Sequence, residues 1–545
     1  MLVSLFTHVA YAQPISDAEL TRRLMQQQEE ARGRLGNAPD VFSQPTAIKK
    51  ATVLEFPGEA PCFVISTVEL RDAQLFEWLY PAANLALHHC IGAKGLRLLQ
   101  DHLAGELINR GYVTARVLIP EQNLSVGHLV IQLVPGRISL VRSEGTPVGL
   151  HRMALPQAGG GLLNQRDLDQ ALENIRRLSG QQGVEFDLVP SAAPGETDLV
   201  IRHPDAKRWR ALISLDDSGA AATGKYQLGG VLTIDSPLYL YDALTLTLNN
   251  NANYGNGTLG TNSSSISWSV PFGYWMLSLA VNRSVYKQTV AGFMGDIVYG
   301  GRSHGAEIGL TYVPYRTGNA KAFIQFKLNR KISRSHIDDV EIDVQHRDVS
   351  GYEVNFNHRQ YIGQNTLDVG FGLRGSLPEQ SRSPGMIVGV PDWDGRYRIG
   401  TANVNLIIPF QLAKQNLRYQ ASWRLQHTSS VLPAAEFFSI GSRYSVRGFD
   451  GASTLSAESG WMLRNDVVWS LSQSAQEVFL AFDTGRVSGS SADLLLGRAL
   501  TGAALGLRGK LGSFNYDASI GWPLKKPEAF KTQKPTFTAY AAAEF

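Results

Sequence analysis

The sequence predicts small α+β domains followed by a C-terminal transmembrane β-barrel of about 16 antiparallel strands. Two features of the chain predict this fold class. First, helical periodicity gives way after Pro204 to an apolar–polar alternation that continues to the end of the sequence. Second, only 18% of the residues are charged, yet no apolar run approaches the roughly 18 residues of a membrane helix. Composition alone leaves a large soluble β protein as the alternative, and the motifs below favour the barrel.

The overall charge argues against one class of function. The 545 residues carry 51 basic and 48 acidic side chains, a formal net charge of +3. Because nucleic-acid binding requires a basic excess, no nucleic acid is expected as a partner. The 12 histidines are scattered without an acid–base set or a Gly-rich phosphate loop, so we expect neither an enzyme nor a cofactor. His88-His89 beside Cys90 could suggest a metal site, but a solvated helix end is favoured.

The chain begins with an apolar stretch, residues 1–12, that ends in Ala10-Tyr11-Ala12. This small-x-small pattern suits a signal peptidase, so we expect a clipped signal peptide with cleavage before Gln13. The stretch lacks the basic region that begins a complete signal, and a disordered apolar N-terminus is the alternative.

Residues 13–35 predict a polar helix. Ser16 and Glu19 form a capping box that opens it, and its few apolar residues make a packed core an unsuitable environment. A water-filled lumen would suit this helix, whereas an isolated, fraying helix is the alternative that the sequence leaves open. Loop-favouring Pro, Gly and Asn residues without periodicity then predict a linker over residues 36–61.

Two units of similar plan follow, at residues 62–136 and 137–204. In the first, residues 63–65 and 68–70 predict a strand, and an apolar stripe between Leu96 and Ile108 predicts a helix. The second repeats the plan, with a helical stripe between Leu168 and Leu178 and strands at residues 184–186 and 199–201. Each unit is too small to form a catalytic cleft.

Cys62 and Cys90 are the only cysteines. An even count in an exported chain predicts one disulfide. Closing the loop between them would stabilise the fold by roughly 3–4 kcal/mol in the loop-entropy model, if the geometry permits. Two buried free thiols are the alternative if the protein stays in the cytoplasm.

Residues 205–545 carry the pattern of a barrel. In Ile266–Val270 the apolar side chains share one face, residues 271–273 predict a tight turn, and Leu277–Asn282 returns with the same alternation. Lipid on one face and water on the other would impose this pattern. The last strand ends on Phe545, an aromatic that can anchor at the membrane interface.

Two short motifs predict an ion pair inside the barrel. Val446-Arg447-Gly448-Phe449 places an arginine on a loop, and Phe482-Asp483-Thr484-Gly485 places a carboxylate on a strand. A planar guanidinium can bind a carboxylate with two hydrogen bonds, so the two motifs together suggest an internal ion pair between Arg447 and Asp483. A surface arginine and an unrelated turn aspartate are the alternative.

These features resemble the outer-membrane transporters of two-partner secretion, the haemolysin and filamentous-adhesin secretion proteins (TpsB class), which are related to the barrel-assembly proteins. Besides the two motifs above, the resemblance is carried by Pro61-Cys62-Phe63, Gly111-Tyr112-Val113-Thr114-Ala115-Arg116, Leu124-Ser125-Val126-Gly127-His128-Leu129, Asp217-Ser218-Gly219, Ile234-Asp235-Ser236-Pro237, Phe438-Ser439-Ile440-Gly441, Arg464-Asn465-Asp466 and Gly521-Trp522-Pro523-Leu524. Asp217, Ser236 and Asp466 depart from the family's commoner residues, yet each keeps a polar group.

The resemblance implies two periplasmic polypeptide-transport-associated (POTRA) domains, a 16-stranded barrel, a plug helix at residues 13–35 and a sixth extracellular loop that folds into the lumen. It implies a protein of the Gram-negative outer membrane that secretes one large unfolded exoprotein (TpsA type), with or without activating it. The POTRA domains would bind this client, lipid would surround the barrel, and the barrel-assembly machinery would insert it. An assembly factor is the alternative, although such factors usually carry more periplasmic domains. A passive porin fits the long N-terminal region poorly.

Overall fold

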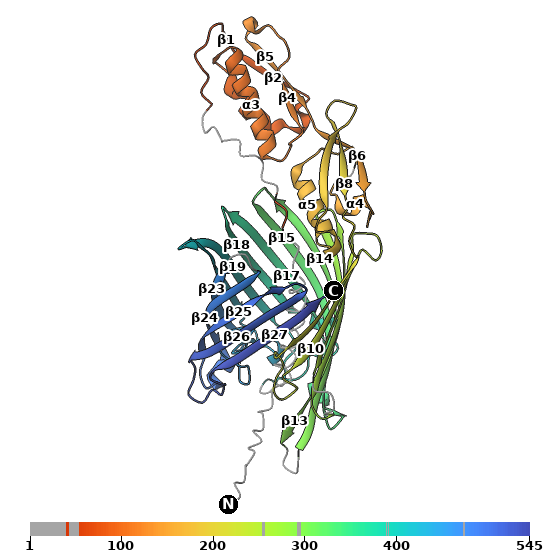
Figure 1. Cartoon of the computed structure of the whole chain (residues 1–545), viewed down its shortest axis with the longest axis vertical. Helices are drawn as coiled ribbons and strands as arrows, with labels where there is room; N and C mark the ends of the chain where they lie inside the picture. Colours follow the sequence, from red (N-terminus) through yellow and green to blue (C-terminus); the bar gives the residue numbers. More distant parts are fainter. Residues whose placement is uncertain are drawn as a thin grey trace, which may run out of the picture.

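The computed structural model describes residues 40–42, 54–157, 159–252, 257–291, 296–387, 390, 392–471 and 475–545. The predicted signal peptide (1–12) and plug helix (13–35) lie outside the described residues, as does most of the predicted linker. Two small domains stand in a row on one side of a large β-barrel (Figure 1). We call that side of the barrel proximal and the opposite side distal. No helix in the described part of the chain combines the length and apolar character needed to cross a membrane.

The first small domain packs one long helix on a three-stranded sheet. The sheet has the order β2 (Thr67–Arg71), β5 (His128–Val134), β4 (Arg116–Leu118), with β2 parallel and β4 antiparallel to β5. The helix α3 (Ala93–Asn109) buries Leu99, Leu103 and Leu107, spaced at four-residue intervals, against Leu129 and Ile131 of β5. The predicted helix is therefore confirmed.

The first predicted strand is wrong in one respect. Residues 63–70 form two strands in different sheets, because β1 (Phe63–Val64) pairs with β3 (Cys90–Ile91) and only β2 joins the main sheet. Near this break, Glu59 caps α3 by accepting hydrogen bonds from the backbone N–H groups of Gly95, Lys94 and Gly92 at 2.8–2.9 Å. These hydrogen bonds, from Gly95 first, hold the pKa of Glu59 below its usual value.

The second small domain repeats this topology. Its sheet has the order β6 (Arg137–Glu144), β8 (Glu196–Arg202), β7 (Glu185–Pro190), with β6 parallel and β7 antiparallel to β8. The helix α5 (Gln165–Arg176) begins after Asn164, whose side-chain oxygen accepts a hydrogen bond from the Arg166 N–H group at 2.8 Å. Its apolar face buries Leu168, Ala171 and Ile175 against the sheet. A short helix, α4 (His151–Ala154), lies beside it.

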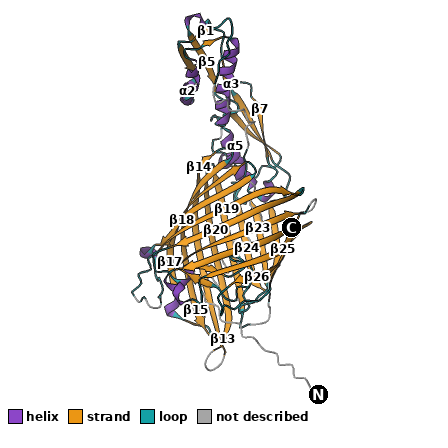
Figure 2. Cartoon of the chain, turned by 90° about the vertical axis from the view of Figure 1, so that its left-hand side faces the viewer, coloured by secondary structure: helices purple, strands orange, loops and turns teal. Residues whose placement is uncertain are grey.

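The barrel consists of sixteen long antiparallel strands (Figure 2). In chain order they are β9 (Trp209–Asp216), β10 (Gln227–Asp235), β11 (Ala243–Asn251), β12 (Gly260–Phe272), β13 (Trp275–Ala291), β14 (Asp296–Arg316), β15 (Ala320–Ile337), β17 (Arg347–Ile362), β18 (Asn365–Ser376), β19 (Arg398–Leu412), β20 (Gln415–His427), β23 (Ser459–Ser470), β24 (Gln476–Ser488), β25 (Ala499–Leu511), β26 (Phe514–Lys525) and β27 (Thr536–Glu544). The two-residue strand β16 (Val340–Glu341) extends one distal hairpin. The predicted barrel and its strand number are confirmed.

The sheet closes where β27 pairs with β9, over Tyr540–Glu544 against Leu212–Asp216. Phe545 extends this seam, since its backbone N–H and carbonyl groups bond those of Ala211 at 2.9 and 3.2 Å. Its side chain is exposed.

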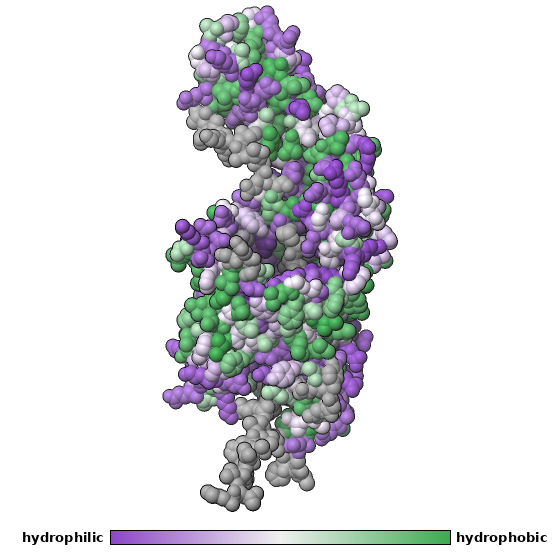
Figure 3. Space-filling model, in the orientation of Figure 1, coloured by the Kyte–Doolittle hydropathy of each residue, from purple (hydrophilic) through white to green (hydrophobic). Residues whose placement is uncertain are grey.

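Alternation along each strand sorts side chains between the outer surface and the lumen. On β24, Leu480 and Phe482 are 59% and 51% exposed on the outer face, whereas Ala481 and Asp483 are buried. Repeated over the barrel, this pattern produces the apolar belt in Figure 3. The belt is flanked by hydrophilic surface on the proximal and distal sides, as expected for strands that cross a bilayer.

The second domain is joined tightly to the proximal turns of the barrel. The Asn174 side chain of α5 donates a hydrogen bond to the carbonyl oxygen of Gly273, in the turn between β12 and β13, at 2.8 Å. Arg177 donates to the carbonyl oxygen of Tyr241, in the turn before β11, at 2.5 Å. Burial lowers the pKa of Arg177 to about 10, so its guanidinium remains charged at neutral pH. Tyr241 itself belongs to the domain's apolar core.

Candidate functional site

The long distal segment between β20 and β23, residues 428–458, folds back against the inner barrel wall, and we call it loop 6. It contains the short hairpin β21 (Phe438–Ile440) and β22 (Leu455–Ala457). Its apolar residues form a buried cluster with strands β23, β24 and β25 and with the last distal loop. The cluster comprises Ile440, Val446, Phe449, Leu455, Ala457, Met462, Val487, Ala492, Leu500 and Phe530. Loop 6 therefore has a core of its own.

Arg447 and Asp483 meet inside the barrel. The Arg447 Nε and Nη2 atoms donate to the two Asp483 carboxylate oxygens at 2.7 and 2.8 Å, and the Arg447 backbone N–H group donates to Oδ2 at 3.0 Å. The Asp483 side chain is completely buried. Asp466, on β23, forms a second ion pair with Arg447 at 2.6 Å. The loop is thus held by a two-point, charge-assisted contact.

The glycines of the two motifs permit close approach between loop and wall. Gly448 has φ +94°, and a Cβ atom there would lie 2.5 Å from the carbonyl oxygen of Trp522 on β26. On the wall, Gly485 lies beneath Val446, where a Cβ atom would come within 3.2 Å of the valine side chain. Phe449 packs in the loop core, 5.7 Å from Phe530 between ring centroids.

One side chain of the motif Phe482-Asp483-Thr484-Gly485, which we call the wall motif, points away from loop 6. Phe482 lies on the outer face of β24, and its neighbours Asp483 and Gly485 share the inner face. The alternation of the strand requires this, because successive side chains point to opposite sides. Within the wall motif, loop 6 is contacted from the inner face by Asp483 and Gly485.

A second tether, which we did not predict, joins loop 6 to the barrel seam. The Arg443 Nη1 atom donates to Asp217 Oδ1 at 3.0 Å, and the same oxygen accepts a hydrogen bond from the Ala539 N–H group of β27 at 2.9 Å. Asp217 belongs to one of the motifs named above, but nothing in the sequence connects it with Arg443, because the two residues lie far apart in the chain.

One described part of the predicted linker, Asp40–Phe42, is bound at the proximal rim of the barrel. The Asp40 carboxylate forms ion pairs with Arg359 of β17 and, at 3.7 Å, with Lys321 of β15. It also accepts a hydrogen bond from the Tyr361 hydroxyl at 3.2 Å. Burial alone would raise the pKa of Asp40, but Arg359 and Lys321 outweigh burial and lower it. Asp40 is therefore held as a carboxylate.

Arg316, at the proximal end of β14, connects this segment to the second domain. Its Nη1 atom donates to Gln170 Oε1 at 2.8 Å and to Glu173 Oε2 at 2.9 Å, both on α5. Its Nη2 atom donates to the carbonyl oxygen of Val41, and its guanidinium lies over the Phe42 ring. We call this meeting of linker, α5 and barrel the rim junction. The Arg316 side chain is 1% exposed there.

Cys62 and Cys90 form the predicted disulfide, with a Cα–Cα distance of 5.3 Å. It joins the chain just before β1 to the first residue of β3, at the edge of the first domain.

Replacing both cysteines by serine should loosen this domain by about 3–4 kcal/mol, the loop-entropy value for the 28-residue separation. Hydrogen exchange measured by mass spectrometry on the whole protein should show faster exchange in β1, β3 and α3, and unchanged exchange in the barrel strands. The unaltered protein treated with reductant should match the double variant. Unchanged exchange after reduction would mean that the apolar core alone stabilises the domain.

The comparisons with known proteins agree with this architecture. A family model described as "Haemolysin secretion/activation protein ShlB/FhaC/HecB" matches residues 195–509. Models for a "POTRA domain, ShlB-type" and a "POTRA domain" match residues 63–136 and 137–190.

Similar proteins cover nearly the whole chain. The "Outer membrane transporter CdiB-2" of Burkholderia pseudomallei (strain 1026b) is 31% identical over 97% of this chain and 94% of its own. The "Hemolysin transporter protein ShlB" of Serratia marcescens is 25% identical over 79% and 77%. Among solved structures, "CdiB from Acinetobacter baumannii" has a TM-score of 0.85 at 27% identity and covers 98% of this chain and 100% of that one.

Proposed function

The chain belongs to the haemolysin secretion/activation family ShlB/FhaC/HecB, and from this membership we propose how it exports its client. It is an outer-membrane transporter of two-partner secretion, and its POTRA domains lie in the periplasm. The proximal side of the barrel is therefore periplasmic and the distal side faces outwards. One observation carries the proposal. Loop 6 is docked through Arg447 and Asp483 inside the barrel, and the periplasmic side of that barrel bears two joined domains.

The proposed course of events follows this arrangement. One large unfolded exoprotein is captured by the POTRA domains, at residues 62–136 and 137–204, and passes through the barrel formed by residues 205–545. The Arg447–Asp483 pair anchors loop 6 on the inner wall at rest. The family is one of transporters, and we propose that this chain catalyses no reaction. We also propose that the barrel-assembly machinery inserts the barrel into the membrane.

The free edge of β7 suits the capture of an extended polypeptide. Among the described residues β7 pairs with β8 alone, so its other side offers unused backbone groups for a further strand. Leu188 and Val189 on this strand are 36% and 45% exposed. The opposite edge, β6, is partly covered, because Ile138 bonds the backbone of Gly160 and Gly161 at 2.7 and 3.0 Å. Client binding by strand addition at β7 needs little sequence specificity.

Site-specific photo-crosslinking in cells tests this proposal. A photo-reactive residue in place of Leu188 should capture one very large exported polypeptide, identified by mass spectrometry. Leu140, on the covered β6 edge, is 57% exposed and provides the matched control. Equal capture at both positions would contradict binding at β7. A mixture of unrelated barrel proteins at Leu188 would instead favour an outer-membrane assembly factor.

A further inference from the structure

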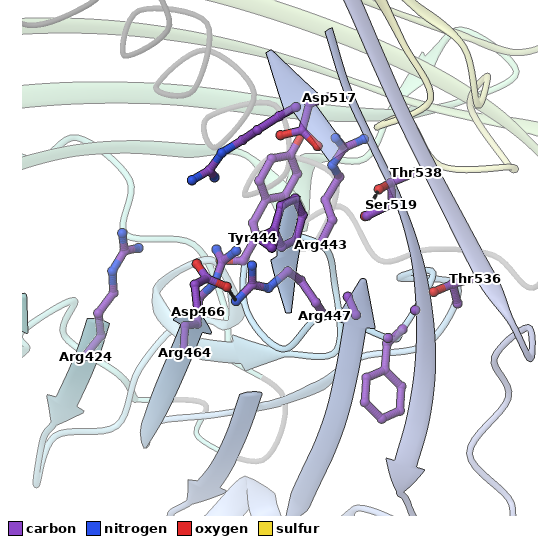
Figure 4. A pocket seen from close by; sticks show the side chains of 16 residues that line it. Arg424, Arg443, Tyr444, Arg447, Arg464, Asp466, Asp517, Ser519, Thr536 and Thr538 are labelled. Carbon is purple, nitrogen blue, oxygen red and sulfur yellow. Dashed lines mark hydrogen bonds and ion pairs between the residues drawn. The ribbon is translucent and has the colours of Figure 1, made fainter. Parts of the chain in front are cut away.

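The lumen beside loop 6 contains a cavity of ≈ 440 Å³ in which most of the charged lining residues are basic. Its charged residues are Arg424, Arg443, Arg447, Arg464, Arg508, Asp466 and Asp517. They come from four barrel strands and from loop 6, and Figure 4 shows Arg424 apart from the group that contains Arg447, Arg464 and Asp466. Five arginines against two aspartates raise the question of which positive charges remain without a counter-ion.

Three of the arginines have carboxylate partners at hydrogen-bonding distance. Arg447 is neutralised by Asp483 and Asp466, as described above. Arg443 is paired with Asp217 at 3.0 Å. Arg508 is paired with Glu477 at 2.9 Å, a carboxylate that it shares with Arg418. These three arginines therefore carry little unneutralised positive charge.

The other two arginines are neutralised poorly. Arg464 Nε lies 3.9 Å from Asp483, whose oxygens already accept three hydrogen bonds from Arg447. The closest hydrogen bond of Arg464 goes to the carbonyl oxygen of Tyr444, at 3.4 Å. Arg424 forms no ion pair with any residue that the structure describes. The wall thus presents one unpaired guanidinium and one partly paired guanidinium.

Strand register places these two side chains on the same face of the wall. Ser422 of β20 lies opposite Arg464 of β23, and Arg424 lies opposite Met462, two positions further along. Diagonal neighbours of this kind lie about 7–8 Å apart between Cα atoms, within reach for long side chains. Met462 belongs to the loop 6 core, which identifies this face as the lumen face.

Arg424 is accessible from two directions. It lines the first cavity and also a second one of ≈ 390 Å³, which continues along the inner wall towards β13 and β14. It is an exposed residue, and Tyr444 also lines both cavities. An extended polypeptide that moved along this wall would come within reach of Arg424.

We propose that Arg424 and Arg464 form a binding site for carboxylate side chains of the polypeptide in transit. This inference rests on the proposed function, since the occupant is the exported client. A guanidinium binds a carboxylate with two parallel hydrogen bonds, and the confined lumen strengthens the attraction of an anion to an unneutralised charge. Because water reaches both guanidinium groups, each contact remains weak and the client is released readily.

Binding of acidic peptides to the purified full-length transporter in lipid nanodiscs tests the site. Hexaglutamate should bind more tightly than hexaglutamine in a titration at low salt. Arg424→Gln should weaken hexaglutamate binding about two- to fivefold, the range for a solvent-accessible ion pair. Arg464→Gln should have an effect in the same direction, and high salt should remove both differences.

Arg486→Gln is the matched control, because Arg486 is exposed on the outer face of β24 and the change in charge is the same. It should leave hexaglutamate binding unchanged. Equal affinity for hexaglutamate and hexaglutamine, or an unaltered affinity in Arg424→Gln, would overturn the proposal. Displacement of hexaglutamate by inorganic phosphate at equal charge concentration would also overturn it, since the site would then take free anions. The assay uses no exoprotein, so its failure leaves the capture test at Leu188 unaffected.

Discussion

Arg447→Ala should abolish secretion of the exoprotein while leaving the barrel folded. The variant leaves the Asp483 carboxylate, which is completely buried, without its two-point partner. Removing one partner of a buried ion pair costs about 3–5 kcal/mol, because the remaining charge stays desolvated. That cost weakens the docking of a loop that is also held by its apolar cluster, by Arg443 and by the ion pair between Glu436 and Arg374 of β18.

Limited proteolysis from outside the cell measures the detachment directly. Loop 6 should be cleaved rapidly in Arg447→Ala and slowly in the unaltered protein, while heat-modifiable mobility in electrophoresis reports an intact barrel in both. Arg447→Lys keeps the charge but lacks the planar fork, so an intermediate rate is expected. Normal secretion together with a protected loop in Arg447→Ala would remove the ion pair from the mechanism.

Arg316→Ala should loosen the attachment of both the second POTRA domain and the linker at the rim junction. This single side chain, 1% exposed, bonds Gln170 and Glu173 of α5 and the carbonyl oxygen of Val41. Loss of the guanidinium removes a charge-assisted contact from α5 and another from the linker. We therefore expect the rim junction to be destabilised by about 3 kcal/mol. Lys321 remains available to Glu173, so the α5 carboxylate keeps one partner.

Spin labels on the second domain and on the exposed turn at Lys414 report this change. Pulsed electron–electron double resonance, which measures the distance between the two labels, should give a narrow distribution for the unaltered protein and a broad one for Arg316→Ala. Arg302→Ala, an exposed arginine on the same strand, is the matched control and should leave the distribution narrow. A narrow distribution in both variants would show that Asn174 and Arg177 suffice to hold the domain.

The sequence was informative wherever a residue's role depends on its neighbours along the chain. Alternation located the barrel strands, and leucines at four-residue intervals located α3, because each pattern follows from burial of one face. The same alternation also determines that Phe482 faces outwards, although the motif groups it with Asp483 and Gly485, which face the lumen. The boundary between β1 and β2 was missed because both strands are short and only two residues separate them.

Contacts that form only when the barrel closes could not be predicted from patterns among neighbouring residues. Arg447 and Asp483 were predicted together because a family resemblance joined two distant motifs. No motif joined Arg443 with Asp217, or Asp40 with Arg359, and these pairs span 226 and 319 positions. Their geometry exists only once strand number and register have fixed the diameter of the barrel. Arg424 was missed for the same reason, since lack of a partner is a property of the closed lumen.

The seam between β27 and β9 has a consequence for the order of assembly. It brings Asp217 and Ala539 together across 322 positions, with every other barrel strand between them. Contacts of such long range form late in folding, because the chain must be ordered before they can be made. The Arg443–Asp217 bond requires both a closed seam and an inserted loop, so it marks the moment at which biogenesis ends. A transporter trapped before that moment would have β9 paired with β10 alone, and its other edge would still face the lipid.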